Sequence, residues 1–164
     1  MPSKKKSVDA KNIAKTTVGD KSIGEYWEIA KLPVYVSIGL SVLSFLLVFG
    51  MGAVGLGITA LIGLVALAVW LWLGWRAVKE FGCDLKSAAI AGAVGGVISG
   101  IVGAVITVVE FSALPGMMAG AYGAAYATMA GAAIVTSAIM APIMGAIMGA
   151  ILSLVGAFLA QNMK

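Results

Sequence analysis

Charged residues are missing from three long parts of this chain, and apolar residues fill those parts. No Asp, Glu, Lys, Arg or His occurs within 32–75, 87–109 or 111–163. A helix needs about 20 apolar residues to cross the hydrocarbon core of a bilayer, because each residue adds about 1.5 Å. The pattern therefore predicts an all-α integral membrane protein, built as a bundle of transmembrane helices.

The first uncharged part, 32–75, is too long for one span and about right for two. Repeated glycine within 50–57 weakens a helix and permits a tight reversal of the chain. We therefore expect a first span over 33–49 and a second over 58–75. Pro33 would then stand in a first helical turn, where its missing N–H has no partner to lose.

A polar stretch over 76–86 follows the second span, and residues 87–109 are long enough for a third. Residues 111–116 contain a Pro-Gly pair, which is typical of a turn. This segment is expected to reverse the chain on the side of the membrane opposite the polar stretch.

The apolar residues after this turn again exceed one span. A proline disfavours helix at the residue before it, so Pro142 predicts a reversal or a kink. A reversal there would give separate spans over 117–140 and 143–160, which is the reading we follow. Five spans place the C-terminus on the side opposite the N-terminus. The alternative is four full spans plus a re-entrant segment, with both termini on one side, since irregular backbone at membrane depth must be covered by protein or water.

The chain before the first span has two parts. Residues 1–21 are polar and Lys-rich, and we expect a flexible basic tail. Residues 22–31 begin with Ser22 and Glu25 at the spacing of a capping box, and they predict a short interfacial amphipathic helix. The remaining residues, 32–164, form the transmembrane domain.

The net charge of +4 reflects these membrane-flanking segments rather than a basic folded face, so we expect anionic lipid head groups as partners and no nucleic acid. By the positive-inside rule, the tail and the polar stretch face the cytoplasm. An uncleaved first span fits a prokaryotic cytoplasmic membrane. The residues expected at the lipid surface are Lys4, Lys5, Lys6, Lys11, Lys15, Lys21, Arg76 and Lys79.

Residue types that carry chemistry are scarce. The chain has one cysteine, Cys83, and no histidine, which removes the usual zinc, haem and nucleophile–histidine arrangements. No cofactor and no enzymatic activity are expected. Glu110 is an acid near the far edge of the third span, and we keep ion or proton coupling as a minor hypothesis for it.

Small residues recur every four positions in the apolar segments, which leaves one helix face almost without side chains. Such faces permit close helix packing in lipid, where the hydrophobic effect no longer draws helices together. They could pack spans of one chain or of several copies. The helix-packing residues that we predict are Gly92, Gly96, Gly100, Gly95, Ser99, Gly103, Gly145, Gly149, Ser153, Gly116 and Gly120. Ser37, Ser41 and Ser44 are interpreted as packing groups as well.

Two functions agree with this pattern. The first is a non-enzymatic scaffold or integral subunit of a membrane complex, which associates through small-residue faces with other subunits or with its own copies. The alternative is a small oligomeric channel, a holin-like pore or a transporter component, because a pore can be lined by hydroxyls and backbone without charged residues.

Overall fold

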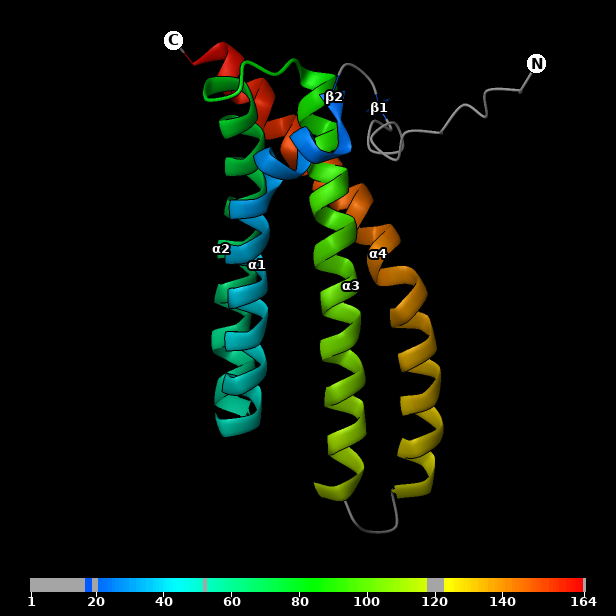
Figure 1. The fold of residues 1–164 in the computed structure, drawn as a ribbon. Helices are drawn as coiled ribbons and strands as arrows, with labels where there is room; N and C mark the ends of the chain where they lie inside the picture. The colour runs from blue at the N-terminus through cyan, green and yellow to red at the C-terminus, as the bar shows by residue number, and fades with distance from the viewer. Residues whose placement is uncertain (1–16, 19–20, 52, 118–122, 164) are drawn as a thin grey trace, which may run out of the picture.

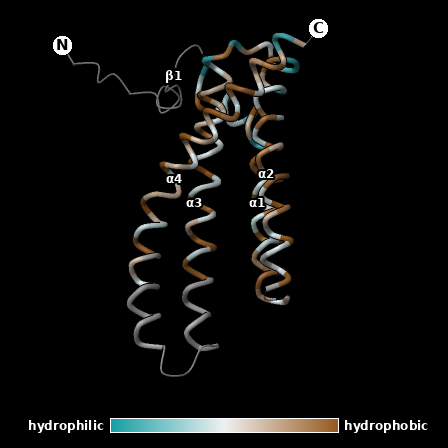
Figure 2. Tube along the Cα trace, turned by 180° about the vertical axis from the view of Figure 1, so that it is seen from behind, coloured by the Kyte–Doolittle hydropathy of each residue, from teal (hydrophilic) through white to brown (hydrophobic). Residues whose placement is uncertain are grey.

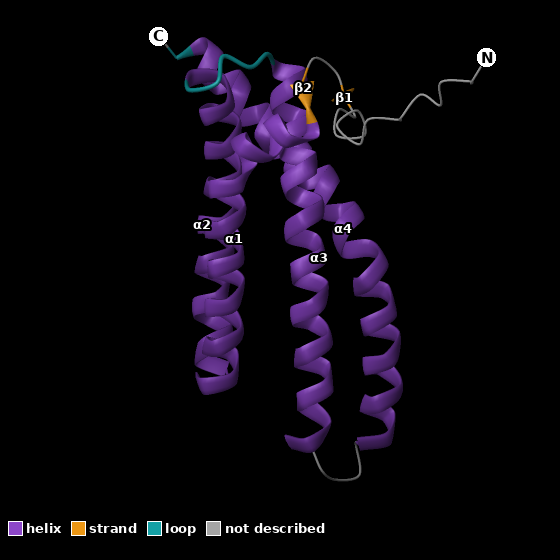
Figure 3. Ribbon diagram, viewed as in Figure 1, coloured by secondary structure: helices purple, strands orange, loops and turns teal. Residues whose placement is uncertain are grey.

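The computed structural model describes residues 17–18, 21–51, 53–117 and 123–163. It is an all-helical protein apart from one short pair of strands, as Figure 3 shows. The helices are α1 (Ile23–Met51), α2 (Ala53–Lys79), α3 (Leu85–Met117) and α4 (Gly123–Asn162). The strands β1 (Thr17–Val18) and β2 (Lys21–Ser22) pair antiparallel within the segment that was expected to be a flexible tail.

Four helical segments are long and apolar enough to cross a membrane. They are Ile23–Met51, Gly57–Lys79, Leu85–Val109 and Ile134–Asn162. The prediction of a helical membrane protein is therefore supported in the described part of the chain. Polar residues gather at one end of the bundle, whereas the lengths of the helices are mostly apolar (Figure 2).

The helices form two hairpins, α1 with α2 and α3 with α4, which meet at one end and diverge toward the other (Figures 1 and 2). We call the meeting end the charged end, because the last turn of α2 carries Arg76 and Lys79 there, and Lys79 contacts Met163 next to the C-terminus. We call the opposite end the open end. At the charged end Lys79 Nζ donates a hydrogen bond of 3.0 Å to the carbonyl oxygen of Met163.

The buried core lies at the charged end, where all four helices meet. Tyr26 and Ile29 of α1 and Leu73 of α2 are almost fully buried there. Small side chains of α3 and α4 complete this core and allow the helix axes to approach closely. The buried cluster consists of Tyr26, Ile29, Ala30, Val34, Leu73, Ala77, Cys83, Ala88, Ala91 and Ala157.

The expected reversal at Pro142 is wrong, because α4 is one helix through this residue. A turn of a few apolar residues inside lipid would leave several backbone groups unpaired, whereas a proline in a continuous helix loses one hydrogen bond. Gly100 of α3 accommodates the proline: a Cβ there would lie 2.4 Å from the carbonyl oxygen of Ala141 and 2.7 Å from Pro142 Cα. The described residues contain four long helices, and separate fourth and fifth spans are not seen among them.

The four helices also change the expected position of the C-terminus, which five spans would place at the end opposite the start of α1. The end of α4 lies beside the loop between α2 and α3, at the same end of the bundle as the start of α1 (Figure 1). The turn expected over 111–116 is also displaced, since α3 continues to Met117. Residues 118–122, which connect α3 to α4 in the sequence, lie outside the described residues.

The reversal predicted within 50–57 is confirmed, because α1 ends at Met51 and α2 begins at Ala53. Glycine is needed at position 55 because α1 and α2 approach each other too closely there for a side chain. A Cβ at Gly55 would lie 2.2 Å from the carbonyl oxygen of Leu47, so any side chain would push the two helices apart.

Ser22 ends β2, and residues 23–31 are the first part of α1 rather than a separate helix. The capping box forms as predicted: the Ser22 backbone N–H donates to Glu25 Oε2 at 2.7 Å, and the Glu25 N–H donates to Ser22 Oγ at 3.4 Å. Most of the apolar face of this segment is covered by protein, since Tyr26 and Ala30 are fully buried, whereas Ile23 at its start is exposed.

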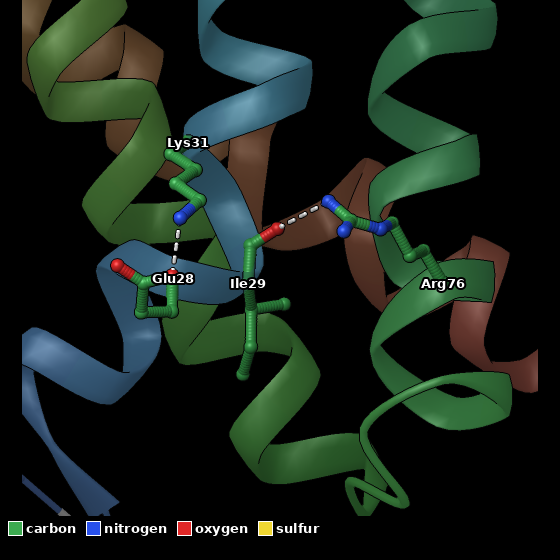
Figure 4. Close-up of polar contacts among 4 residues, drawn as sticks. All are labelled: Glu28, Ile29, Lys31 and Arg76. Carbon is green, nitrogen blue, oxygen red and sulfur yellow. Dashed lines mark hydrogen bonds and ion pairs between the residues drawn. The ribbon is translucent and has the colours of Figure 1, made fainter.

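Pro33 stands inside α1, not in its first turn. It cannot donate to the carbonyl oxygen of Ile29, the acceptor four residues earlier. Arg76 of α2 provides a replacement, because its Nη1 donates to that oxygen at 3.4 Å (Figure 4). The same guanidinium pairs with Glu80 at 2.6 Å and lies over the rings of Trp72 and Phe81. Figure 4 also shows the neighbouring ion pair between Lys31 and Glu28.

Candidate functional site: a hydroxyl-lined cleft between α1, α2 and α3

The predicted glycine rows of α3 and α4 face each other. A Cβ at Gly96 would lie 1.9 Å from the carbonyl oxygen of Gly145, and one at Gly92 would lie 2.2 Å from that of Gly149. The reverse distances, from Gly145 to Gly96 and from Gly149 to Gly92, are 2.2 and 2.3 Å. Backbone therefore touches backbone along this contact, which we call the glycine seam.

A buried hydrogen bond extends the glycine seam toward the charged end. Ser153 Oγ of α4 donates to the carbonyl oxygen of Ala88 of α3 at 2.7 Å, and the Ser153 side chain is fully buried. This bond satisfies a hydroxyl that would otherwise be unpaired in an apolar surrounding. It also fixes the position of α4 along α3.

A second close contact, between α2 and α4, did not emerge from the four-residue pattern. A Cβ at Gly74 would lie 1.8 Å from the carbonyl oxygen of Ser153, and one at Gly156 would lie 1.9 Å from that of Leu71. Gly74 stands alone among large residues, so no repeat in the sequence indicated its role. This contact joins the two hairpins near the charged end.

The remaining predicted small residues of α3 do not all lie in the glycine seam. A Cβ at Gly95 would approach side chains of the other hairpin, at 3.1 Å from Val34 and 3.2 Å from Trp70. Gly103 has nothing within 4 Å of its Cβ position. Together with Ser99, it borders a space between the two hairpins.

That space is a cleft of about 390 Å³ bounded by α1, α2 and α3. Hydroxyl side chains from all three helices lie along it, among apolar side chains that include Trp70. Its lining residues are Ser37, Leu40, Ser41, Ser44, Thr59, Ile62, Gly63, Ala66, Trp70, Ser99, Gly103, Ile106 and Thr107.

Three hydroxyls of the cleft donate to carbonyl oxygens of their own helices. Ser41 Oγ donates to Ser37 at 3.0 Å, Thr59 Oγ1 to Gly55 at 2.9 Å, and Thr107 Oγ1 to Gly103 at 3.0 Å. Because each hydroxyl has one proton, these three oxygens have only acceptor capacity left.

Two further hydroxyls have no partner. Ser37 Oγ and Ser99 Oγ are buried and make no hydrogen bond within the described part of the chain. Ser37 is 7% exposed. A buried hydroxyl without a partner is costly, and it normally has a hydrogen-bonding neighbour such as water or a ligand.

The cleft combines acceptors and free hydroxyls without any charged side chain among its lining residues. Sequence reasoning identified Ser37, Ser41 and Ser44 but assigned them to helix packing, and it missed Thr59 and Thr107. Hydroxyls on three separate helices form one surface only after the hairpins are placed, so spacing along the chain gave no signal for this grouping.

The residues expected at a lipid surface divide into two groups. Arg76 and Lys79 make the internal contacts described above, and Lys21 lies in β2. The five lysines before residue 17 lie outside the described residues. Only the helical backbone is described at Glu110 and Gly116, and Gly120 lies outside the described residues. Among the described residues, no three His, Cys, Asp or Glu side chains gather as they would around a metal ion.

Cys83 lies in the loop between α2 and α3 and is buried. Burial raises the pKa of its thiol, an effect that the charge of Lys21 partly offsets. A raised pKa keeps the thiol protonated at neutral pH, and a protonated thiol is a poor nucleophile.

Asp84 caps the start of α3, because its Oδ1 accepts the backbone N–H of Ser87 at 2.8 Å. Hydrogen bonds from Ser87, first from its side chain and then from its backbone, hold the pKa of Asp84 below its ordinary value. A depressed pKa means that the carboxylate stabilises the fold at higher pH and loses this effect as pH falls through the folded-state pKa.

Replacement of Asp84 by Ala is therefore expected to lower the thermal midpoint by about 2–4 °C at pH 7. The difference between wild type and variant should shrink when pH falls below the ordinary value of 3.8 for this carboxyl. Thermal unfolding in detergent at pH 7 and pH 3 measures both effects. An equal difference at both pH values would show that the carboxylate does not act as the cap.

No family model, no curated protein and no solved structure matches this chain.

Proposed function

We propose that this is a non-enzymatic multi-span membrane protein that acts as an integral subunit or scaffold of a membrane complex. The proposal is carried by the divergence of its two hairpins. The hairpins touch at the charged end through Gly74 and Gly156, and they separate toward the open end (Figure 1).

Because the hairpins diverge, the helix surfaces that face each other across the gap are not covered by other parts of the chain. In the glycine seam, the small-residue faces of α3 and α4 cover each other within one molecule, so these faces are not free to bind another copy. The uncovered surface between the hairpins includes backbone-sized positions such as Gly63 and Gly103, which allow close approach of another helix. A partner helix would complete the packing that four helices leave open.

The orientation of the protein belongs to the same proposal. The loop between α2 and α3 and the Lys-rich tail carry the positive charges beside the membrane, and the positive-inside rule places such segments in the cytoplasm. The charged end would then be cytoplasmic. The lysines before residue 17 would bind anionic head groups, with about 1 kcal/mol gained per Lys near an anionic surface.

Native mass measurement of the complex, extracted from its own membrane into lipid nanodiscs, tests the proposal. We expect this chain to be released together with at least one different membrane protein at a fixed ratio. A single chain surrounded only by lipid would contradict a subunit role. A discrete ring of identical chains would favour the second candidate below.

The second candidate is a small channel, a pore or a transporter component, and the hydroxyl-lined cleft favours it. Neutral hydroxyls could line a path for uncharged solutes between copies of the chain. Solute flux in proteoliposomes that falls in the Ser99→Leu variant, while vesicle integrity is unchanged, would support this function. Tight vesicles at high protein density would exclude it.

A further inference from the structure

We propose that the cleft between α1, α2 and α3 binds a neutral lipid whose head group carries free hydroxyls, such as a monoacylglycerol. The site needs only the three helices of one molecule, but Gly63 and Gly103 also belong to the surface proposed for a partner helix, so a lipid and a partner helix would exclude each other there. The volume of the cleft, about 390 Å³, lies within the range of about 300–1,000 Å³ that is usual for ligand pockets.

The chemistry of the lining selects the head group. Ser41, Thr59 and Thr107 have their protons engaged by backbone carbonyls, so they offer only lone pairs to a ligand. A ligand therefore has to bring hydrogen-bond donors. A free hydroxyl is such a donor, and unlike an ammonium group it needs no counter-charge.

Ser37 and Ser99 give a second, separate indication of an occupant. Their hydroxyls are buried and unpartnered in the described part of the chain, and both residues line the cleft. Neither oxygen has accessible surface in this structure, so each would pair with a ligand hydroxyl after its side chain turns toward the cleft, as donor or as acceptor. An apolar occupant would leave both without a partner.

The absence of charge among the lining residues restricts the ligand to neutral molecules. A fatty-acid anion or a phosphate would lose its hydration in the cleft without a cation to replace it. The apolar part of the lining, with Leu40, Ile62, Trp70 and Ile106, provides contact for an acyl chain.

The position of the cleft determines how such a ligand would enter. The buried core closes the charged end of the bundle, whereas the hairpins diverge toward the open end. Counted at about 1.5 Å per residue, Ser37 lies about 9 Å beyond Lys31 along α1, which is inside the membrane region. Entry from the lipid phase between the hairpins therefore needs no opening of the core.

The test uses the full chain in lipid nanodiscs and a photoactivatable monoacylglycerol, with the labelled residues mapped by mass spectrometry. We expect labels on the cleft segments of α1 and α3, and competition by unlabelled monoacylglycerol. Its diacetylated form has the same chain but no donors and should compete at least fivefold less well. Equal competition by the two forms, or labels spread evenly over the outer faces of the helices, would overturn the proposal.

Variants separate binding from folding. Ser37→Ala and Ser99→Ala are each expected to weaken competition about fivefold, which is the usual effect of one hydrogen bond. Ser137→Ala is the matched control, because this hydroxyl lies on α4 and donates to the carbonyl oxygen of Ile134. It should leave competition unchanged.

The thermal midpoint measured without the lipid probe separates a ligand-binding role from a structural one. If the hydroxyls only stabilised the fold, alanine would lower this midpoint. Alanine at Ser37 or Ser99 removes a buried, unpaired hydroxyl, so the thermal midpoint should stay the same or rise. A lower midpoint together with weaker competition would show that these hydroxyls hold the fold rather than a ligand, and it would overturn the assignment.

Discussion

Alanine at Gly96 is expected to separate α3 from α4, with a loss of at least about 3 kcal/mol in the free energy of unfolding. The added methyl group would stand 1.9 Å from the carbonyl oxygen of Gly145, where only backbone is present to yield. Gly92→Ala and Gly145→Ala should behave similarly, at distances of 2.2 Å from the opposing carbonyl oxygens. Unfolding in detergent, followed by helix content and by reactivity of the buried Cys83, measures the loss.

Two glycines with open surroundings serve as controls. Gly39 of α1 and Gly131 of α4 have nothing within 4 Å of their Cβ positions. Alanine at either position should be neutral or stabilise the helix by up to about 1 kcal/mol. If Gly96→Ala proved as stable as Gly39→Ala, the close contact of the glycine seam would be refuted.

The glycine rows were visible in the sequence, but their partner was not. A four-residue repeat places small residues on one helix face, and it says nothing about which surface covers that face. The structure pairs Gly92 with Gly149 and Gly96 with Gly145 inside one chain. Gly74 and Gly156, which join the hairpins, belong to no repeat that sequence reasoning could separate from the general abundance of glycine.

The two prolines show why the bounds of the helices were predicted incorrectly. Sequence reasoning treated Pro142 as a reversal and Pro33 as a helix start, and both lie inside helices. Proline is disfavoured in helices of water-soluble proteins, whereas in lipid the alternative is a turn with many unpaired backbone groups. The cost of one lost hydrogen bond is smaller, and neighbouring groups can reduce it further.

The capping box at Ser22 and the glycine-rich reversal near Gly55 were predictable because each depends on residues close together in the chain. The cleft was not. Its hydroxyls come from α1, α2 and α3, and their common orientation depends on how the hairpins are joined at the charged end. No local pattern contains that information.

Pro33 and Arg76 are expected to be energetically coupled, although they stand on different helices. Arg76→Ala should cost about 2–3 kcal/mol, because it leaves the carbonyl oxygen of Ile29 unpaired and removes the contact with Glu80 and two aromatic rings. In a Pro33→Ala background, the new backbone N–H can reach Ile29. The same arginine change should then cost about 1 kcal/mol less.

The coupling is measured by the free energies of unfolding of the wild type, the two single variants and the double variant. Glu80→Gln is the control for the ion pair, whose acid is half exposed, and it should cost less than about 1 kcal/mol in either background. Arginine here does more than balance a charge, since it replaces the hydrogen bond that the proline cannot make. Single-variant effects that simply add, within about 0.5 kcal/mol, would mean that Arg76 stabilises the charged end without assisting the helix at Pro33.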